Sequence, residues 1–149
     1  MASGAYSRGV LNILNGTIDA DTTVTKMGLA KSAYVPAPDE SSLTTFALSE
    51  ADCTGYTGGF AGAGRKSVTV TLTEQTANNR VVTIFGDLTW TAIGGAVNNT
   101  LAYPVWLREI TNDTLSVPLC FLQFTNLTTN GSDVLVDFDG TNGNVRWTV

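Results

Sequence analysis

The residues best suited to chemistry are few, and no subset of them forms a complete catalytic set. The chain has no histidine, so the commonest general base and a common metal ligand are both missing. Paired carboxylates occur at Asp39 with Glu40 and at Glu50 with Asp52. Both pairs fall in predicted loops without an apolar setting that would shift a pKa, which favours solvated charges over acid–base catalysis. We therefore expect that the protein is not an enzyme.

Two further stretches bear on metals and cofactors. Asp137, Asp139 and Asn142 loosely resemble a calcium-binding loop, but the register is wrong and no downstream acidic residue supplies the bidentate ligand. A hairpin turn rich in Asp, Asn and Gly needs no metal. The glycines between positions 58 and 64 form neither a Walker pattern nor a dinucleotide fingerprint. We expect no metal and no cofactor.

Aromatic side chains leave one binding chemistry open. Trp90, Trp106, Trp147 and Tyr103 could form a platform that stacks on sugar rings. Each falls within a predicted strand, where packing in the core is the commoner fate.

Composition points to a single domain with an unusual surface. The 149 residues suit one domain with its own core. Charged residues make up 14%, against about 25% in typical globular proteins. Neutral hydroxyl and amide side chains can be buried against a partner without desolvation of charge. This favours a protein that is part of a larger assembly. A threonine-rich β surface without a partner is an equal alternative.

Charge and hydropathy also exclude some partners. The net charge is −5 and the basic residues are scattered, so we expect no nucleic-acid binding. No apolar run approaches a membrane span, and no secretory signal is visible at the start; we expect no membrane partner. Cys53 and Cys120 are too few for a disulfide scaffold, and two free thiols are expected, with Cys120 buried.

Short apolar segments rich in Val, Ile, Phe, Trp and Thr, separated by turn residues, predict the fold. We expect an all-β protein, an antiparallel β-sandwich or flattened barrel of about seven to eight strands with a short N-terminal helix. The predicted strands are 22–33, 66–73, 80–85, 87–92, 103–110, 117–124, 133–138 and 145–149.

Pairing and register follow from turns and alternation. The strands from 103 to 110 and from 117 to 124 are predicted to form one hairpin, and those from 133 to 138 and from 145 to 149 a second. Alternation of apolar and hydroxyl side chains predicts core positions along one further hairpin. These positions are Val68, Val70, Leu72, Val82 and Ile84.

Two segments are suited to a partner rather than to the core. A helix is predicted over Ala5–Asn15, with Gly16 after its end, and it is too short to be stable alone. The region Tyr34–Gly64 is predicted as a long loop with a helical turn at 41–48, and so long a loop is usually functional or fixed by a partner. Within the single domain 1–149, we expect a helix or arm at 1–16, this loop region at 34–64, and a self-sufficient β core at 66–149.

The apolar side chains of these two segments are the candidates for contact with a partner subunit or a larger assembly. They are Tyr6, Val10, Leu11, Leu14, Tyr34, Phe46, Tyr56 and Phe60.

The order of motifs resembles that of a family of small tailed-bacteriophage virion proteins encoded near the major capsid protein. The resemblance covers most of the chain, in short motifs. They are LNILNGTID (11–19), DTTVTKMGLAKSAYVPAPD (21–39), SEADCTGYTGG (49–59), KSVTVTLTEQTANNRVV (66–82), DLTWTA (87–92), WLREI (106–110), PLCFLQF (118–124), DVLVDFDG (133–140) and VRWTV (145–149). The chain differs from the family pattern in having VVTIFG before DLTWTA, and a cysteine in PLC.

The resemblance implies a virion role. The expected function is that of a capsid decoration (cement) protein that binds the outer shell and bridges capsid subunits. Its partner would be the major capsid protein, with homo-oligomers, such as trimers, on the capsid exterior after synthesis in the bacterial cytoplasm. The alternative is a tail or head-fibre module that recognises a host-surface glycan through Trp106 or Tyr103.

Overall fold

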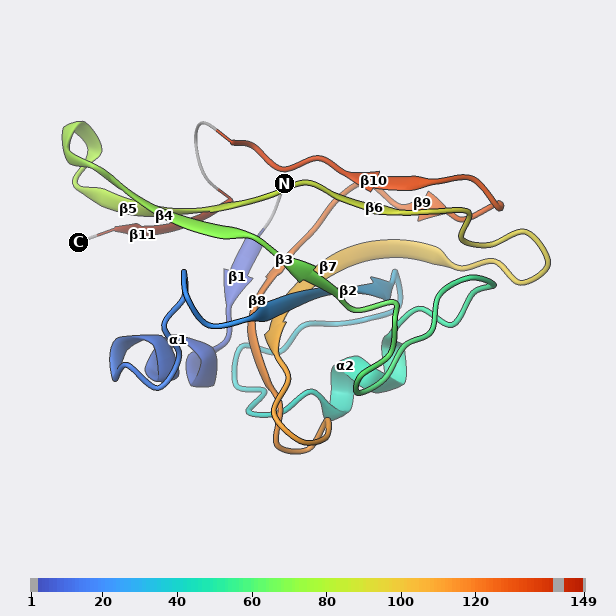
Figure 1. Cartoon of the computed structure of the whole chain (residues 1–149), viewed down its shortest axis with the longest axis horizontal. Helices are drawn as coiled ribbons and strands as arrows, with labels where there is room; N and C mark the ends of the chain where they lie inside the picture. The colour runs from blue at the N-terminus through green and yellow to red at the C-terminus, as the bar shows by residue number, and fades with distance from the viewer. Residues whose placement is uncertain (1–2, 141–143, 149) are drawn as a thin grey trace.

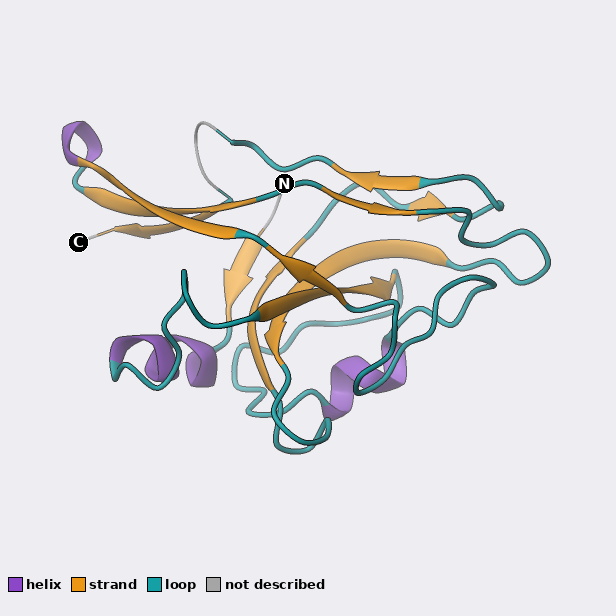
Figure 2. Cartoon of the chain, viewed as in Figure 1, coloured by secondary structure: helices purple, strands orange, loops and turns teal. Residues whose placement is uncertain are grey.

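The computed structural model describes residues 3–140 and 144–148, and of residues 146–148 only the backbone. Antiparallel strands dominate it, with one helix of two turns near the N-terminus (Figure 1; Figure 2). This confirms the predicted all-β sandwich with a short N-terminal helix. More strands are present than the predicted seven to eight, because β1 and β9 are added and the segment 66–75 is divided into two.

The elements follow one another along the chain with short connections except between β2 and β3. They are β1 (Ser3–Ala5), α1 (Ser7–Leu14), β2 (Thr25–Lys31), α2 (Thr44–Ser49), β3 (Lys66–Val68), β4 (Val70–Gln75), a 3-10 turn (Thr76–Asn78), β5 (Arg80–Phe85), β6 (Leu88–Trp90), β7 (Thr100–Arg108), β8 (Val117–Leu122), β9 (Leu127–Thr128), β10 (Val134–Val136) and β11 (Val145–Thr148).

The larger sheet has the order β1-β8-β7-β2-β3, and β9 pairs with the start of β7. The predicted β7–β8 hairpin is confirmed, with Val105 opposite Phe121. β2 lies between β7 and β3. The largest sheet therefore includes a central strand, residues 25–31, from outside the expected β core at 66–149, and the self-sufficiency of that core stays a prediction.

The second layer is built on the segment from β5 to β6. β4 pairs with β5 on one edge, and the returning chain pairs first with β6 through β10 and then with β5 through β11. The predicted hairpin between β10 and β11 is wrong: both run antiparallel to the same segment, so they pair with β5 and β6. The loop between them lies partly outside the described residues.

Aromatic side chains fill the space between the layers. Phe85 packs edge-on against Trp106, with ring centroids 5.1 Å apart. The Trp90 indole N–H donates to the carbonyl of Gly64 over 2.6 Å, and that of Trp106 to Thr25 Oγ1 over 2.8 Å. Trp90 and Trp106 are thus core residues, and neither is available for stacking on a sugar. Tyr103 is half-buried, and the Trp147 side chain lies outside the description.

The alternation along residues 66–84 holds only in part. Val68, Val70 and Val82 are buried, as predicted, but Leu72 is 39% exposed and Ile84 is half-buried. The chain leaves the larger sheet after β3 and enters the second layer as β4. The β4–β5 hairpin then projects beyond the body of the molecule (Figure 1), so the predicted core position of Leu72 is wrong.

The N-terminal helix docks closely on the larger sheet. α1 ends near the predicted residue, with Gly16 at φ +74° directly after the C-cap. A Cβ at Gly9 would lie 2.7 Å from Leu119 Cα, so the glycine allows backbone-to-backbone approach. Both cysteines are free and buried, as predicted, and burial raises the pKa of the Cys120 thiol.

Candidate functional site

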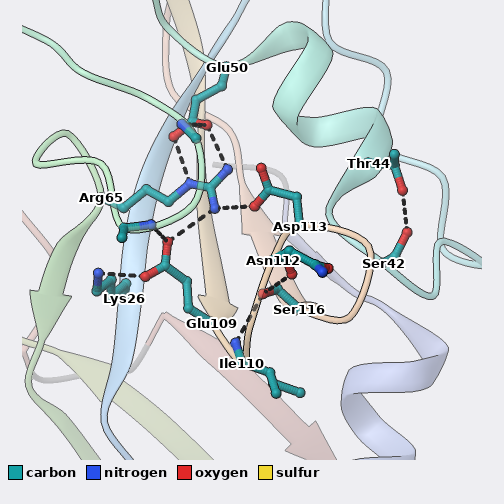
Figure 3. Close-up of polar contacts among 12 residues, drawn as sticks. Lys26, Ser42, Thr44, Glu50, Arg65, Glu109, Ile110, Asn112, Asp113 and Ser116 are labelled. Carbon is teal, nitrogen blue, oxygen red and sulfur yellow. Dashed lines mark hydrogen bonds and ion pairs between the residues drawn. The ribbon is translucent and has the colours of Figure 1, made fainter.

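The most unusual site in the described residues is a buried arginine. Arg65 is 2% exposed and forms a two-point ion pair with Glu50, which is also buried. Arg65 Nε lies 2.9 Å from Glu50 Oε1, and Nη2 lies 2.7 Å from Oε2 (Figure 3). The guanidinium also stands over the ring of Phe46, 5.4 Å from its centroid. Such a fork geometry is specific to arginine and carboxylate.

Two further carboxylates complete the cluster. Arg65 Nη1 donates to Glu109 Oε1 over 3.1 Å and to Asp113 Oδ1, while Lys26 Nζ donates to Glu109 Oε2 (Figure 3). Two cations therefore meet three carboxylates. We call Lys26, Glu50, Arg65, Glu109 and Asp113 the ionic cluster. It ties β2, the chain after α2, the glycine-rich loop and the β7–β8 connection into one unit.

Neighbouring donors use the remaining acceptor capacity of the cluster. The Tyr56 hydroxyl donates to Glu50 Oε1 over 3.0 Å, and the Gly59 N–H donates to Glu50 Oε2 over 2.8 Å. The Ala61 N–H donates to Glu109 Oε1 over 3.0 Å. Buried charges need such satisfaction to be tolerated. The cluster consequently fixes the backbone of the glycine-rich loop 57–64.

The electrostatics keep Glu109 and Arg65 in their ordinary charge states. Burial alone would raise the pKa of Glu109, but its contacts with Lys26, the Ala61 N–H and Arg65 lower the pKa below its usual value. Burial alone would lower the pKa of Arg65, but the hydrogen bonds to Glu50 and Asp113 raise it. Burial and the Glu50 charge raise the pKa of Tyr56. A carboxylate that paired cations hold in its ionised form stabilises the fold and is poorly suited to proton transfer.

Four exposed apolar side chains lie close in the chain to members of the ionic cluster or to Ala61, which donates to it, and we call them the apolar end: Leu48, Phe60, Ile110 and Leu115. Phe60 precedes Ala61, and Ile110 follows Glu109, so the hydrogen bond from the Ala61 N–H to the Glu109 carboxylate links the two segments that carry them. The Ile110 N–H donates to Ser116 Oγ over 3.0 Å, beside Leu115 (Figure 3). Leu48 shares an open groove with Gly58 and Gly59.

The structure divides the eight predicted contact residues into two groups. Tyr6, Tyr34, Phe46 and Tyr56 are buried, so their place in the core corrects the expectation that they face a partner. Each has a partner inside the chain: the Tyr6 and Tyr34 hydroxyls lie 2.6 Å apart, and the Leu29 N–H donates to the Tyr56 hydroxyl over 2.9 Å.

The remaining candidates stay accessible. Leu11 and Leu14 on α1 are exposed, Phe60 is 41% exposed, and Val10 is half-buried. Leu48 is 83% exposed. The sequence pattern did not predict it as a contact candidate, because α2 is too short to define an apolar face.

The expectation for the paired carboxylates is wrong at Glu50 and in part at Glu40. Glu50 is buried in the ionic cluster, whereas Asp52 is exposed and pairs with Lys31. Glu40 accepts a hydrogen bond from the Tyr34 hydroxyl over 2.9 Å, and its Oε1 atom is buried without a partner in the described residues. Desolvation raises the pKa of Glu40.

No local signal in the sequence predicts burial of Arg65. It follows a glycine-rich stretch that reads as a flexible loop, and its partners Glu50, Glu109 and Asp113 are far away in the chain. The one available signal is the scarcity of charge. In a chain with few ionisable residues, a charged residue beside an apolar strand end, such as Glu109, merits a search for a buried partner.

Within residues 3–140 and 144–148, we also looked for a metal site and for a membrane-spanning helix. No three His, Cys, Asp or Glu side chains there are grouped so that they could hold a metal ion. Asp137 and Asp139 are exposed, and Asn142 lies outside the described residues. None of the described helices is long and apolar enough to cross a membrane.

Comparison with known proteins identified no relative of this chain. No protein-family model matches the chain, and neither a curated protein nor a solved structure matches it.

Proposed function

We propose that this protein is a bacteriophage capsid decoration protein, which binds the outer shell of the capsid and bridges its subunits. The observation that carries the proposal is the apolar end, where exposed apolar side chains sit on loops that the buried ionic cluster holds in place. Preformed loops lose little conformational entropy on binding. The order of motifs, which resembles that of small virion proteins, supports the same class of function.

The contact surface would combine the apolar end with the outer face of α1. Leu11 and Leu14 are exposed on α1, and Leu48 and Phe60 are exposed at the apolar end. Exposed aromatic and aliphatic side chains are the usual anchors of protein interfaces. The sparse charge of the chain lowers the desolvation cost of covering this surface.

The alternative, glycan recognition by a tail or head-fibre module, has less support. Trp106 is buried with its indole N–H satisfied by Thr25, so it cannot stack on a sugar without unfolding. Tyr103 is half-buried, and its ring packs against Tyr34.

Copy number separates the two functions. In virions that carry this protein, quantitative gel densitometry should give an amount comparable to that of the major capsid protein. An amount typical of a tail or fibre component would favour the alternative and contradict decoration.

The contact surface is tested by point variants in a binding assay on particles stripped of this protein. Phe60→Ser and Leu48→Ser are expected to weaken binding about ten-fold or more each, because anchors at an interface typically contribute above 1 kcal/mol. Leu135→Ser is the matched control, since Leu135 is exposed on β10, which belongs to a different sheet from the strands next to the ionic cluster. Equal binding by all three variants would place the contact elsewhere.

A further inference from the structure

β4 has an open edge of unusual character. It pairs with β5 on one side, and no other described strand pairs with it. Its register with β5 is unbroken over six residues, and Thr71, Leu72, Thr73 and Glu74 are exposed. Natural proteins usually protect such an edge with a proline, a lysine, a bulge or a covering segment, and the sequence VTLTEQ carries no proline, lysine or bulge.

The register fixes which backbone groups face outward. The Gly86 N–H donates to the Thr69 carbonyl over 2.9 Å, so residues 69 and 86 form a hydrogen-bonded pair. Because such pairs alternate along an antiparallel ladder, Thr71 and Thr73 also bond to β5. Val70, Leu72 and Glu74 then direct their N–H and C=O groups toward the open edge.

The opposite side of β5 supports this alternation. Thr83, which lies opposite Leu72, accepts a hydrogen bond from the Asn144 N–H over 2.8 Å on the β11 side. The Phe85 N–H likewise bonds to Asn144 Oδ1 over 3.0 Å. Residues 83 and 85 therefore bond away from β4, as the outward direction of Leu72 and Val70 requires.

We propose that β4 is the interface for a second copy of this chain, paired antiparallel about a two-fold axis through Leu72. In this register Leu72 faces Leu72 of the second copy, and Val70 faces Glu74 of the second copy. Every outward-facing N–H and C=O of the strand then gains a partner. An interface of this type is self-complementary by symmetry.

The side chains fit this register. Leu72, which is 39% exposed, is covered by its symmetry mate. Thr71 lies opposite Thr73, and cross-strand threonine pairs are favourable. Glu74 carries the one charge on the edge and faces a neutral valine, so no like charges oppose each other. Moving the axis by one residue to Thr73 would place Leu72 opposite Glu74 and leave outward-facing groups unpaired.

The surroundings allow a second strand to approach. The β4–β5 hairpin projects from the body of the molecule (Figure 1). At the Val70 end, an open groove separates the strand from the loop 20–25. Addition of one strand makes a small interface, so we expect a weak dimer with Kd on the order of 10–100 µM. This interface is independent of the proposed capsid contact.

Disulfide trapping tests the register. Thr71 and Thr73 of the second copy would form a non-hydrogen-bonded pair, in which the Cα atoms lie close enough for a disulfide. A mixture of Thr71→Cys and Thr73→Cys chains, one carrying a size tag, is expected to form the covalent heterodimer under mild oxidation. The yield should exceed that of either variant alone by about ten-fold, while the native cysteines remain buried. Thr73→Cys mixed with Thr111→Cys, a loop position, measures random collision.

Sedimentation velocity gives an independent test. Leu72→Lys places two like charges opposite each other and is expected to weaken the dimer at least ten-fold, whereas Leu135→Lys, at an exposed position on β10, should leave it unchanged. Circular dichroism melts check that both variants fold. A wild-type chain that stays monomeric at millimolar concentration, or trapping no better than random collision, would overturn the proposal. Preferential trapping of Thr73→Cys with itself would overturn this register.

Discussion

Arg65 engages three carboxylates from two separate segments of the chain: Glu50 after α2, and Glu109 and Asp113 in the β7–β8 connection. Replacing a whole buried ion pair with apolar residues can be neutral, but removing one partner leaves the others buried without compensation. The ionic cluster therefore stabilises the fold as a unit, and removing any one member alone is expected to destabilise the protein. Its effect reaches the surface because the same carboxylates accept hydrogen bonds from the glycine-rich loop.

The ionic cluster predicts that a substitution at Arg65 strongly lowers the free energy of unfolding. Arg65→Met is expected to lower the free energy of unfolding by about 3–5 kcal/mol, because Glu50 and Asp113 then lose the cation they pair with and only Glu109 keeps its pair with Lys26. Urea denaturation measures the change. The control is Lys31→Met, which removes the exposed pair with Asp52 and should cost at most about 1 kcal/mol. Similar losses of unfolding free energy in both variants would show that the ionic cluster contributes no special stabilisation.

Glu40 predicts a pH dependence of opposite sign to that of most carboxylates. Its pKa is raised in the folded protein, chiefly by desolvation, so the folded state binds the proton more tightly than the unfolded state. The contribution of Glu40 to stability is therefore greatest below its unfolded pKa and falls as pH rises through the folded pKa.

The test is the difference in unfolding free energy between Glu40→Gln and the wild type from pH ~4 to ~8. The variant should gain relative stability as pH rises, because it has no charge to bury beside Tyr34. A difference that is constant over this range would contradict the raised pKa.

At the scale of elements, local patterns predicted which strands exist, and long-range pairing decided where they lie. β5, β7 and β8 fall where β-branched and aromatic residues gather. The pairing of β10 and β11 with one shared segment has no local signal, because a plausible turn sequence lies between them. The ionic cluster was unpredictable for the same reason: its members come together only when β2, the loop 57–64 and the β7–β8 connection are assembled.

The contact of α1 with β8 predicts an inverted response to a helix-favouring substitution. Alanine at a helix interior position usually gains up to about 1 kcal/mol over glycine. At Gly9 the new Cβ would lie 2.7 Å from both Leu119 Cα and the Pro118 carbonyl oxygen. Backbone atoms cannot yield cheaply, so Gly9→Ala should destabilise the protein by about 1–3 kcal/mol in thermal or urea unfolding.

Gly140→Ala is the matched control for this variant, because a Cβ there meets no atom of the described residues within 4 Å. Its effect should stay within about 0.5 kcal/mol. A stabilising Gly9→Ala would mean that α1 docks less closely than the structure has it.

At the scale of the whole molecule, charge is scarce and largely engaged. Lys26 and Arg65 belong to the ionic cluster, Lys31 pairs with Asp52, and Arg108 donates to the Val24 carbonyl. Exposed carboxylates such as Asp39, Glu74 and Asp137 remain, on a surface made mostly of hydroxyl, amide and apolar groups. Composition alone predicted this character of the surface, but it could not place the apolar end, which depends on tertiary contacts.

For the proposed capsid contact through the apolar end, we predict binding that is insensitive to salt. Contacts between exposed charges weaken as the Debye length shrinks from ~14 Å at 50 mM to ~4 Å at 500 mM salt, whereas burial of apolar area does not depend on screening. The apparent affinity for stripped particles should therefore change by less than about three-fold over this range. The measurement is equilibrium binding of labelled protein at several NaCl concentrations, with Leu48→Lys as a variant that adds a charge to the contact. A wild-type affinity that falls ten-fold or more across the series would mean that charged groups carry the contact, and the apolar end would lose its role.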